Sequence, residues 1–491
     1  MESYFLGIDI GTGSTKAVAL DASGRSLGMA QVSYPTLVPE RGYSEQDPEI
    51  IWEAFVKCFR EITARMGGRL QAVSFSSAMH SLLPVDESGR PLLNLMTWAD
   101  SRAAQIAQQL RDSPDGEPLY RLTGTPVYSI SLVPKILWIR ENMPGVFSRT
   151  CKLISIKEFI WFKLFNAYQI DHSLASATGL FNIRDLEWEP LSLRLAGIDS
   201  TKLSEPVSTG ALRYDLTDDS RKVLGLKEGT AFVIGGSDGC LANLGTFALG
   251  KGRAAITIGT SGAVRIGSTI PIFNYQAMTF NYRLDDETYI CGGPINNGGL
   301  ALDWLIKNFL NKGRITEGDY TNLFERIAGV VPGSEGLIFL PYLVGERAPA
   351  WDTRATGTFF GVTSAHTQDH FCRAVLEGVC FALKEVLEIV EVNEHPIEQI
   401  QVSGGFTGSL LWMQMLADIT QKKVCIVHTE DASAIGAVHL ALKALNFIPD
   451  YAALEHPKGN MMMPTEHSSI YQRNFNIYKR LYPNLKELMH L

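Results

Sequence analysis

YFLGIDIGTGSTKAVAL, residues 4–20, contains two short apolar segments separated by a glycine-rich turn. The first segment predicts a strand that carries one carboxylate, Asp9, to the start of the turn at residues 11–14. Lys16 opens a second predicted strand. Backbone N–H groups in such a turn suit phosphate oxygens, and a carboxylate is the kind of ligand that Mg²⁺ takes. An ordinary hairpin with a glycine turn is an equally good interpretation of this segment alone.

A second copy of the pattern lies at residues 254–266, AAITIGTSGAVRI. Residues 8–12 align with residues 256–260, but only the first copy has an acid at its second position and a lysine after the turn. Charged residues flank one glycine turn and not the other. This asymmetry suits a nucleotide whose metal and transferring phosphate lie on one side. Chance similarity stays open because the repeat is short. A spacing of nearly half the chain suggests two related domains.

The composition is that of a globular protein too long for a single core. The chain has 491 residues, of which 45% are hydrophobic and 20% charged, so two domains of similar size are expected. A net charge of -8 argues against nucleic acid or an anionic membrane as the main partner. Any anionic substrate would therefore need local positive charge.

The cysteines and the N-terminal residues indicate in which cellular compartment the protein is expected. Seven scattered cysteines without a Cys-x-x-Cys pair predict reduced thiols in a cytoplasmic protein, not a disulfide framework or a zinc site. No basic flank with a long apolar run opens the chain, so no signal peptide is expected. No apolar stretch is long enough to span a bilayer. The oligomeric state is not fixed by the sequence, and a homodimer stays open.

Predicted strands alternate with amphipathic helices along the chain, which indicates an α/β fold with ligands gathered at strand ends. The expected strands include residues 26–32, 70–76, 231–235 and 399–403, and the expected helices include residues 48–66, 152–165, 370–392 and 409–420. We place the domain boundary near residue 247, which gives units 1–247 and 248–491.

Residues 235–239, GGSDG, end a predicted strand and offer two kinds of chemistry. Phosphoryl transfer needs alignment, neutralised charge and a group that accepts the hydroxyl proton, so Asp238 is a candidate general base beside Asp9 and Lys16. A turn aspartate that bonds its own backbone is the commoner fate of Asp next to Gly. The segment also fits the Gly-x-Ser-x-Gly elbow of serine hydrolases, with Ser237 as nucleophile. That alternative leaves both glycine turns unexplained.

Two further glycine pairs are candidates for nucleotide contact. Gly404-Gly405 precedes a predicted helix and would let a base or ribose approach the backbone closely, helped by Gly298-Gly299. A plain strand-to-helix turn explains the first pair equally well. No Gly-x-x-x-x-Gly-Lys-Ser/Thr segment occurs, which argues against a P-loop enzyme. His80 follows a predicted buried strand, where a structural histidine is the commoner case.

Together these motifs resemble the FGGY carbohydrate kinases, members of the actin, hexokinase and Hsp70 superfamily. GIDIGTGSTK and IGTSG are similar to the two phosphate motifs of the family, and GGSDG is similar to the segment that carries its catalytic aspartate. Residues 345–352, GERAPAWD, resemble another family element, and residues 357–377 fit the C-terminal signature throughout. The N-terminal signature is matched only in part, at residues 135–142. The resemblance implies two ribonuclease-H-like α/β domains that flank and close on a catalytic cleft.

The resemblance also implies roles for individual residues. Asp9 would bind Mg²⁺, Lys16 would lie near the transferred phosphate of ATP, and Asp238 would be the base. The implied nucleotide contacts are Thr12, Gly13, Ser14, Thr260, Gly299, Gly404, Gly405 and Ser409. The implied sugar contacts, besides Asp238, are Met79, His80, Trp98 and Asp100.

Finer resemblances bear on the identity of the sugar. SAMHSLLPVD, TWADSRA, ISIKEFIWFKLF and HSLASATGLFN most resemble the gluconokinase branch, so ATP-dependent phosphorylation of gluconate to 6-phosphogluconate is expected. The gluconate carboxylate requires a cation or several N–H donors as its partner. The candidates for this partner are His80, Arg102 and Lys157. Met79-His80 also resembles the ketopentose kinases, which keeps xylulokinase or another pentulose or polyol kinase as the alternative. A non-catalytic member is a third class, disfavoured because both Asp9 and Asp238 are present.

Overall fold

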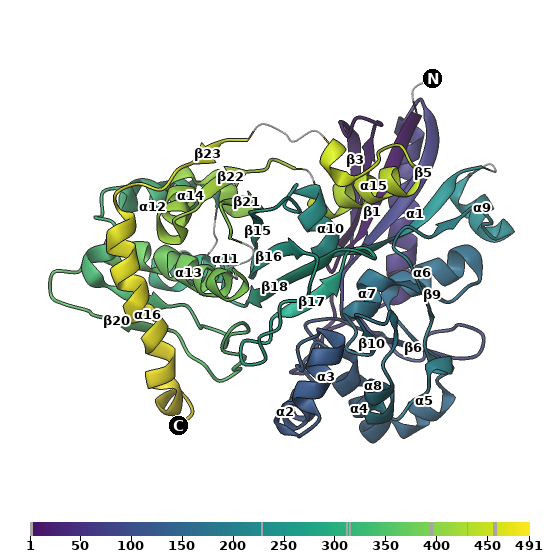
Figure 1. Ribbon diagram of the computed structural model, residues 1–491, viewed down its shortest axis with the longest axis horizontal. Coiled ribbons are helices and arrows are strands. Elements are labelled where there is room, and N and C mark those ends of the chain that lie inside the picture. Colours follow the sequence, from purple (N-terminus) through teal and green to yellow (C-terminus); the bar gives the residue numbers. More distant parts are fainter. Residues whose placement is uncertain are drawn as a thin grey trace.

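The computed structural model describes residues 3–226, 229–310, 313, 316–391, 396–429, 431–454 and 459–491, which form two main sheets (Figure 1). Within these residues the first sheet has six strands in the order β13-β14-β5-β1-β2-β3, and the second has seven in the order β17-β18-β16-β15-β21-β22-β23. The strands of the first sheet are β1 (Ser3–Ile10), β2 (Ser14–Leu20), β3 (Ser26–Ser33), β5 (Arg69–Ser77), β13 (Leu212–Arg213) and β14 (Ala231–Ser237). Those of the second are β15 (Arg253–Ile258), β16 (Gly262–Ser268), β17 (Phe280–Arg283), β18 (Tyr289–Ile295), β21 (Gln399–Ser403), β22 (Lys423–Ile426) and β23 (Met461–Met462).

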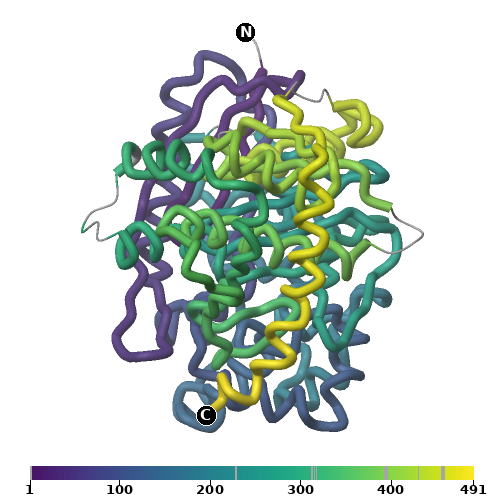
Figure 2. The backbone as a smooth tube through the Cα atoms, turned by 90° about the vertical axis from the view of Figure 1, so that its left-hand side faces the viewer, coloured from purple at the N-terminus to yellow at the C-terminus, as the bar shows by residue number. Residues whose placement is uncertain are grey.

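Helices surround both sheets, and the last of them, α16, runs down the face of the molecule shown in Figure 2. The helices are α1 (Pro48–Arg65), α2 (Ala104–Asp112), α3 (Gly116–Thr123), α4 (Leu132–Asn142), α5 (Pro144–Arg149), α6 (Ile156–Phe165), α7 (His172–Ser176), α8 (Pro190–Ala196), α9 (Asp218–Leu224), α10 (Asp238–Gly245), α11 (Gly299–Trp304), α12 (Glu317–Ala328), α13 (Gln368–Val390), α14 (Leu410–Thr420), α15 (Ala432–Ala444) and α16 (Ser468–Met489). Short strand pairs complete the described fold: β4 (Glu45–Gln46) with β7 (Leu95–Met96), β6 (Leu83–Val85) with β8 (Lys152–Ile154), β9 (Gln169–Asp171) with β12 (Glu205–Val207), β10 (Phe181–Asn182) with β11 (Glu187–Trp188), and β19 (Ile338–Leu340) with β20 (Thr358–Phe360).

The two main sheets repeat one arrangement around the two glycine turns. β1 pairs antiparallel with β2 and parallel with β5, and β15 pairs in the same way with β16 and β21. In these registers Asp9 stands opposite Lys16, and Thr257 stands opposite Ala263. The sequence repeat therefore marks a repeated structural unit, and the predicted two-unit α/β fold is confirmed.

Alternation along β1 separates the two faces of the first sheet. Ile8 belongs to the core that includes α1, whereas Phe5 packs in a cluster with residues of α15. Because side chains alternate along a strand, Asp9 lies on the same face as Phe5 and therefore toward α15. The helix approaches very closely, since a Cβ on Gly7 would lie 1.9 Å from the carbonyl oxygen of Ala434. Only glycine at this position admits the helix.

Helices α10 and α15 occupy the middle of the molecule, where the two halves meet (Figure 1). They pack against each other, and α15 also contacts β1 and β5 although the chain reaches it only after β22. Asp238 is the first residue of α10, and Asp431 is the N-cap of α15. A helix late in the chain therefore covers one face of the first sheet.

Most predicted elements are present, with differences at their ends. Residues 152–165 were expected to form one helix, but residues 152–154 form β8 and α6 begins only at Ile156. The reason is a capping box, in which Ser155 and Glu158 satisfy each other's backbone N–H groups and fix the helix start. The predicted helix 370–392 is α13, and Val392 lies outside the described residues. Ser409 is the N-cap of α14, not its first residue.

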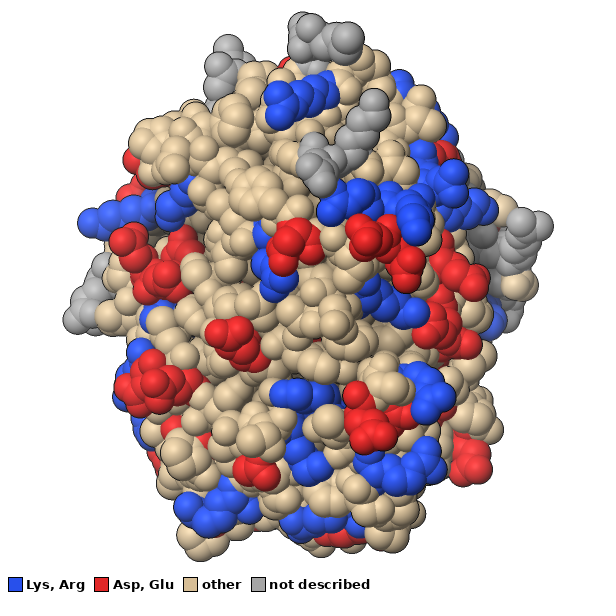
Figure 3. Space-filling model, turned by 90° about the vertical axis from the view of Figure 1, so that its right-hand side faces the viewer, with Lys and Arg blue, Asp and Glu red and all other residues tan. Residues whose placement is uncertain are grey.

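The exterior carries charges of both signs. On the face shown in Figure 3, lysine and arginine side chains alternate with aspartate and glutamate, without an extended patch of one sign. Among the described residues, no helix combines the length and the apolar character needed to cross a membrane.

Candidate active site

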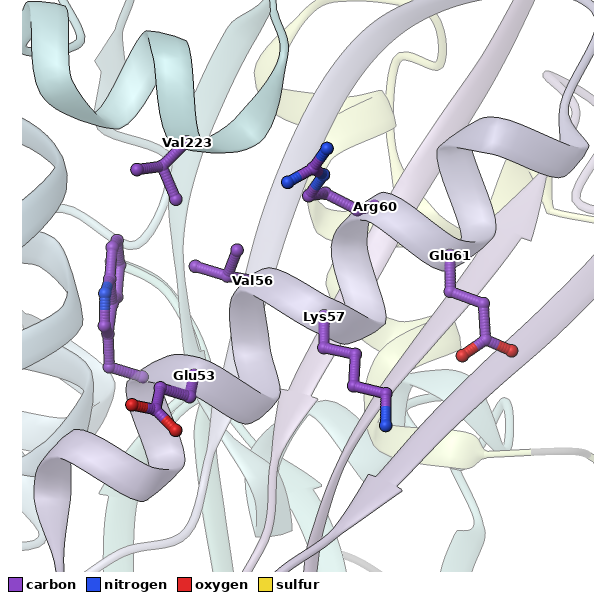
Figure 4. A pocket seen from close by; sticks show the side chains of 7 residues that line it. Glu53, Val56, Lys57, Arg60, Glu61 and Val223 are labelled. Carbon is purple, nitrogen blue, oxygen red and sulfur yellow. The ribbon is translucent and has the colours of Figure 1, made fainter.

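A cavity of about 290 Å³ lies between the two halves of the chain. Its walls come from both, because Met79, His80 and Asp238 belong to the first half and Thr257, Arg265 and Arg347 to the second. A shallower hollow lies on the outer side of α1, where helix side chains and Val223 line it (Figure 4). Since α1 covers the face of the sheet opposite Asp9, the hollow is remote from the predicted chemistry. The cavity between the halves is therefore the candidate active site.

Three carboxylates meet beside this cavity. Asp9 is buried and accepts a hydrogen bond of 2.6 Å from the Ser76 hydroxyl. Burial, followed by the negative charges of Asp431 and Asp238, raises the pKa of Asp9 to about 8. The geometry agrees, because Ser76 stands opposite both Asp9 and Gly236 in the sheet, and Ser433 of α15 donates to the carbonyl oxygen of Asp238 at 3.2 Å. The structure thus brings Asp9 and Asp238 to one place, although 229 positions separate them in the sequence.

Asp431 is a site residue that the sequence analysis missed. Its carboxylate caps α15 by accepting the N–H of Ala434 at 2.9 Å, and its other oxygen lies 2.8 Å from Lys16 Nζ. An N-cap signal is present in the sequence, because Asp431 precedes a long apolar segment. That signal predicts a helix start but not the approach to Lys16.

Asp9 fits the expected role as a ligand of Mg²⁺. A cation would relieve the repulsion that buried Asp9 experiences from Asp238 and Asp431. No group of three His, Cys, Asp or Glu side chains suited to a metal ion occurs in the part of the chain that the structure describes. Mg²⁺ usually takes one or two carboxylates together with water and substrate phosphates, so the donor set at Asp9 is sufficient.

Three predicted sugar contacts line the cavity: Met79, His80 and Trp98. Trp98 also joins the cavity to the first glycine turn, because its indole N–H donates to Thr12 Oγ1 at 3.0 Å. His80 has a positive φ of 62°, and its Nε2 lies 3.3 Å from the Tyr282 hydroxyl. Burial, reinforced by the charge of Lys135, lowers the pKa of His80 to about 3. The imidazole is therefore neutral and supplies no positive charge at physiological pH.

Two other predicted contacts, Asp100 and Arg102, do not line the cavity. Their side chains form a buried ion pair of 2.8 Å, and Arg102 makes a second one with Glu45. Asp100 also accepts the backbone N–H of Ser44 at 2.9 Å. The resemblance of TWADSRA to the gluconokinase branch could not show that these two charges neutralise each other. Arg102 is accordingly withdrawn as a carboxylate ligand, and Asp100 as a direct sugar contact.

Lys157 is likewise engaged within the protein. Its side chain is 2% exposed and forms an ion pair of 2.5 Å with Asp171. Its ammonium also donates to the carbonyl oxygens of Ile234 and Gly236, which supports the strand that leads to Asp238. Lys157 therefore stabilises the strand that leads to Asp238 and does not line the cavity.

Two arginines that the sequence analysis did not single out, Arg265 and Arg347, line the cavity instead. Arg265 lies within the second copy of the repeat and Arg347 within GERAPAWD. Both segments were noted as motifs, but neither spacing shows which side chain turns toward the site.

The predicted nucleotide contacts are divided between the two glycine turns, and those of the second half lie at the second turn or at the same edge of its sheet. The N–H of Gly298 donates to the carbonyl oxygen of Thr260 at 3.1 Å, and that of Gly299 to the carbonyl oxygen of Gly259 at 2.7 Å. Since β21 runs parallel to β15, the exposed glycines Gly404 and Gly405 emerge at the same edge of the sheet. Ser409 caps α14 just beyond them. Thr12, Gly13 and Ser14 form the equivalent turn of the first sheet.

The serine hydrolase alternative fails on accessibility. Ser237 is fully buried, and its hydroxyl lies 2.9 Å from that of Ser173. A nucleophile elbow needs an exposed serine hydroxyl. The segment instead presents Asp238, which lines the cavity.

The N-terminal domain of the FGGY family of carbohydrate kinases matches residues 4–245, and its C-terminal domain matches residues 254–445. The chain belongs to the FGGY family of carbohydrate kinases. This FGGY kinase is 39% identical to a gluconokinase of Bacillus subtilis over 100% of its own length and 96% of the relative. It is 30% identical to a xylulose kinase of Lactococcus lactis over 99% of its length and 98% of the relative.

Solved structures agree with this assignment. The crystal structure of gluconate kinase from Lactobacillus acidophilus matches the FGGY kinase with a TM-score of 0.94 and 31% identity, covering 99% of this chain and 98% of that one. The protein is therefore an ATP-dependent carbohydrate kinase.

Proposed function

We propose that this FGGY kinase transfers the γ-phosphoryl group of ATP to the 6-hydroxyl of gluconate. The observation that carries the proposal is the charge of the cavity, which is lined by two guanidinium groups, Arg265 and Arg347, and one carboxylate, Asp238. Two positive charges and one negative charge leave a net of +1 in a protein whose overall charge is -8. An anionic sugar matches such a cavity better than a neutral one. The similarity to gluconokinases points to the same substrate.

Asp238 is proposed to start the reaction as general base. Its carboxylate removes the proton from the 6-hydroxyl, whose oxygen then forms a bond to the γ-phosphorus while the bond to the leaving ADP oxygen breaks. Burial raises the pKa of Asp238 above its ordinary value, which makes the carboxylate a better proton acceptor near neutral pH. Nearby Arg265 opposes that effect, because its positive charge favours the ionised form of the carboxylate.

The remaining groups are proposed to hold and neutralise ATP. When bound, Mg²⁺ would neutralise phosphate charge, and Asp9 is its protein ligand. Lys16 would exchange its contact with Asp431 for a phosphate oxygen, while Thr12, Gly13, Ser14 and Thr260 offer turn N–H groups or hydroxyls. Gly299, Gly404, Gly405 and Ser409 would border the nucleoside. Units 1–247 and 248–491 would close on the substrates and exclude water.

The test is a coupled assay of ADP release with gluconate, xylulose, ribulose, glycerol and fuculose, followed by NMR of the phosphorylated product. We expect the highest kcat/KM for gluconate and a phosphate on its sixth carbon. Asp238→Asn should lower kcat by about 100- to 10,000-fold while ATP still binds. Asp112→Asn, an exposed acid on α2, serves as the control. Near-normal turnover of Asp238→Asn would remove the proposed base.

A ketopentose kinase is the second candidate. Met79 and His80, which resemble that branch, do line the cavity, and a xylulose kinase is among the full-length relatives. A higher kcat/KM for xylulose than for gluconate would make this candidate the correct one.

A further inference from the structure

Arg265 reaches the cavity from β16 with part of its hydrogen-bonding capacity unused. Its Nη1 donates to Thr257 Oγ1 at 3.1 Å. Among the described residues, its buried Nε has no hydrogen-bond partner. A buried donor without a partner is costly, so its retention at the wall of a substrate cavity points to a ligand that supplies the missing acceptor.

The residue after the proposed base leaves room for this side chain. Gly239 follows Asp238, and a Cβ at that position would lie 3.3 Å from Arg265 Nε and 3.0 Å from Met79 Cε. Any larger residue at position 239 would therefore press on the guanidinium group. The absence of a side chain at position 239 leaves the Nε side of the guanidinium group uncovered by this residue.

Arg347 faces the same cavity but is already held by the protein. Its Nε donates to Asn296 Oδ1 at 2.7 Å, and its Nη2 donates to the carbonyl oxygen of Ile295 at 3.0 Å. The guanidinium carbon lies 5.7 Å from the centre of the Trp98 ring. Arg347 is thus a fixed positive charge, whereas Arg265 has a free donor.

We infer that Arg265 binds the carboxylate of a sugar acid through its Nε edge, with Arg347 as a supporting charge, and that this contact selects sugar acids over neutral sugars. The inference rests on the proposed function and names the residue that gives it specificity. A guanidinium group can offer two parallel N–H donors to a carboxylate. His80, neutral in this site, then contacts the polyol and not the charge.

The experiment compares gluconate with glucitol, which has a CH₂OH group in place of the carboxylate. Both are titrated by calorimetry into the full-length protein in the presence of a non-hydrolysable ATP analogue. The wild type should bind gluconate at least about 100-fold more tightly than glucitol. In Arg265→Met that preference should fall to within about threefold, because only gluconate loses a charged partner. Arg265→Lys, which keeps the charge without the fork, should give an intermediate preference.

Arg283→Met is the matched control, because Arg283 is also buried in the second sheet but stacks over Tyr289 and lies outside the cavity lining. It should keep the wild-type preference. The melting temperature and the affinity for the ATP analogue show whether each variant is folded. If Arg265→Met misfolds, Arg265→Lys alone tests the contact, and an unchanged preference in that variant overturns it.

The outcomes separate the two proposals. A wild-type preference that survives in Arg265→Met overturns the role of Arg265, while gluconate turnover by the wild type would still support the proposed function. Equal losses for gluconate and glucitol would also overturn it, since Arg265 would then act through Asp238 or through the fold. The wild type could instead turn over a different sugar acid and lose its preference for that acid over the neutral sugar in Arg265→Met. This result would support the role of Arg265 and would replace gluconate as the substrate. A wild type that prefers neutral sugars would contradict both proposals.

Discussion

Lys16 Nζ lies 2.8 Å from a carboxylate oxygen of Asp431, in an ion pair between residues 415 positions apart. Lys16 belongs to β2 beside the first glycine turn, and Asp431 caps α15, so the pair ties that turn to the helix beneath Asp9. The Lys16 side chain is 29% exposed. Its ammonium is therefore accessible to a phosphate oxygen that could replace Asp431.

Replacement of Lys16 tests this exchange. Lys16→Met should lower kcat by about 100-fold, because a charge aimed at the transferring phosphate stabilises the transition state more than the bound sugar. Gluconate affinity should stay near the wild-type value. The measurement is steady-state kinetics with varied ATP and gluconate, and Lys57→Met, an exposed lysine of α1, is the control. Full turnover in Lys16→Met would exclude a role in phosphoryl transfer.

The pKa of Asp9 predicts a pH-dependent demand for Mg²⁺. The value is raised from 3.8 to about 8 in the folded, metal-free protein, first by burial and then by Asp431 and Asp238. Between about pH 4 and pH 8, Asp9 is protonated in the folded protein and ionised in the unfolded chain. The free energy of unfolding should therefore decrease as the pH rises. A metal ion must displace that proton, and Mg²⁺ affinity should therefore increase toward pH 8, by up to about tenfold per pH unit.

Calorimetric Mg²⁺ titrations of the complex with the ATP analogue, in buffers of different ionisation enthalpy, measure the released proton directly. Asp9→Asn should weaken Mg²⁺ binding and abolish its pH dependence. Asp431→Asn should keep the helix cap, since asparagine is a good N-cap, and should shift the dependence to lower pH. A proton release that persists in Asp9→Asn would assign the titrating group elsewhere.

The sequence predicted those features that depend on local pattern. The match of residues 8–12 with residues 256–260 indicated two equivalent hairpins, because strands and a glycine turn are encoded within a short segment. It could not show that α15 would cover the first sheet, since that contact joins distant parts of the chain. Charge alone was a poor guide to ligand binding: Arg102 and Lys157 have buried partners, whereas Arg265 has a free donor. Only the packing distinguishes these cases.

His80 offers a matched pair of substitutions for the sugar site. Its φ of 62° lies in the left-handed region, which asparagine and aspartate tolerate better than most residues. His80→Asn and His80→Asp therefore differ mainly in charge. We expect kcat/KM for gluconate to be about 10- to 100-fold lower in His80→Asp than in His80→Asn, because a second carboxylate in the cavity repels the substrate.

A neutral sugar provides the comparison for this pair. Xylulose turnover should differ much less between His80→Asp and His80→Asn, and circular dichroism shows whether both variants retain the fold. The kcat/KM of the wild type should show no step that reports His80 between about pH 5 and 8, because its pKa is lowered to about 3. Equal losses for gluconate and xylulose would mean that a charge at position 80 does not act on the substrate carboxylate across the cavity.

Lys157 should matter for stability and not for recognition of gluconate. Lys157→Met leaves the fully buried Asp171 without its partner, which should lower the free energy of unfolding by about 3–5 kcal/mol. Adding Asp171→Asn removes the unpaired charge and keeps the cap that Asp171 provides to Leu174 N–H, so the double variant should recover much of the loss. Urea unfolding measures both. Arg65→Met, which breaks an exposed pair with Glu61, should cost roughly 0–1 kcal/mol. If Lys157→Met keeps the stability of the wild type and raises only the KM for gluconate, Lys157 would instead be a substrate contact.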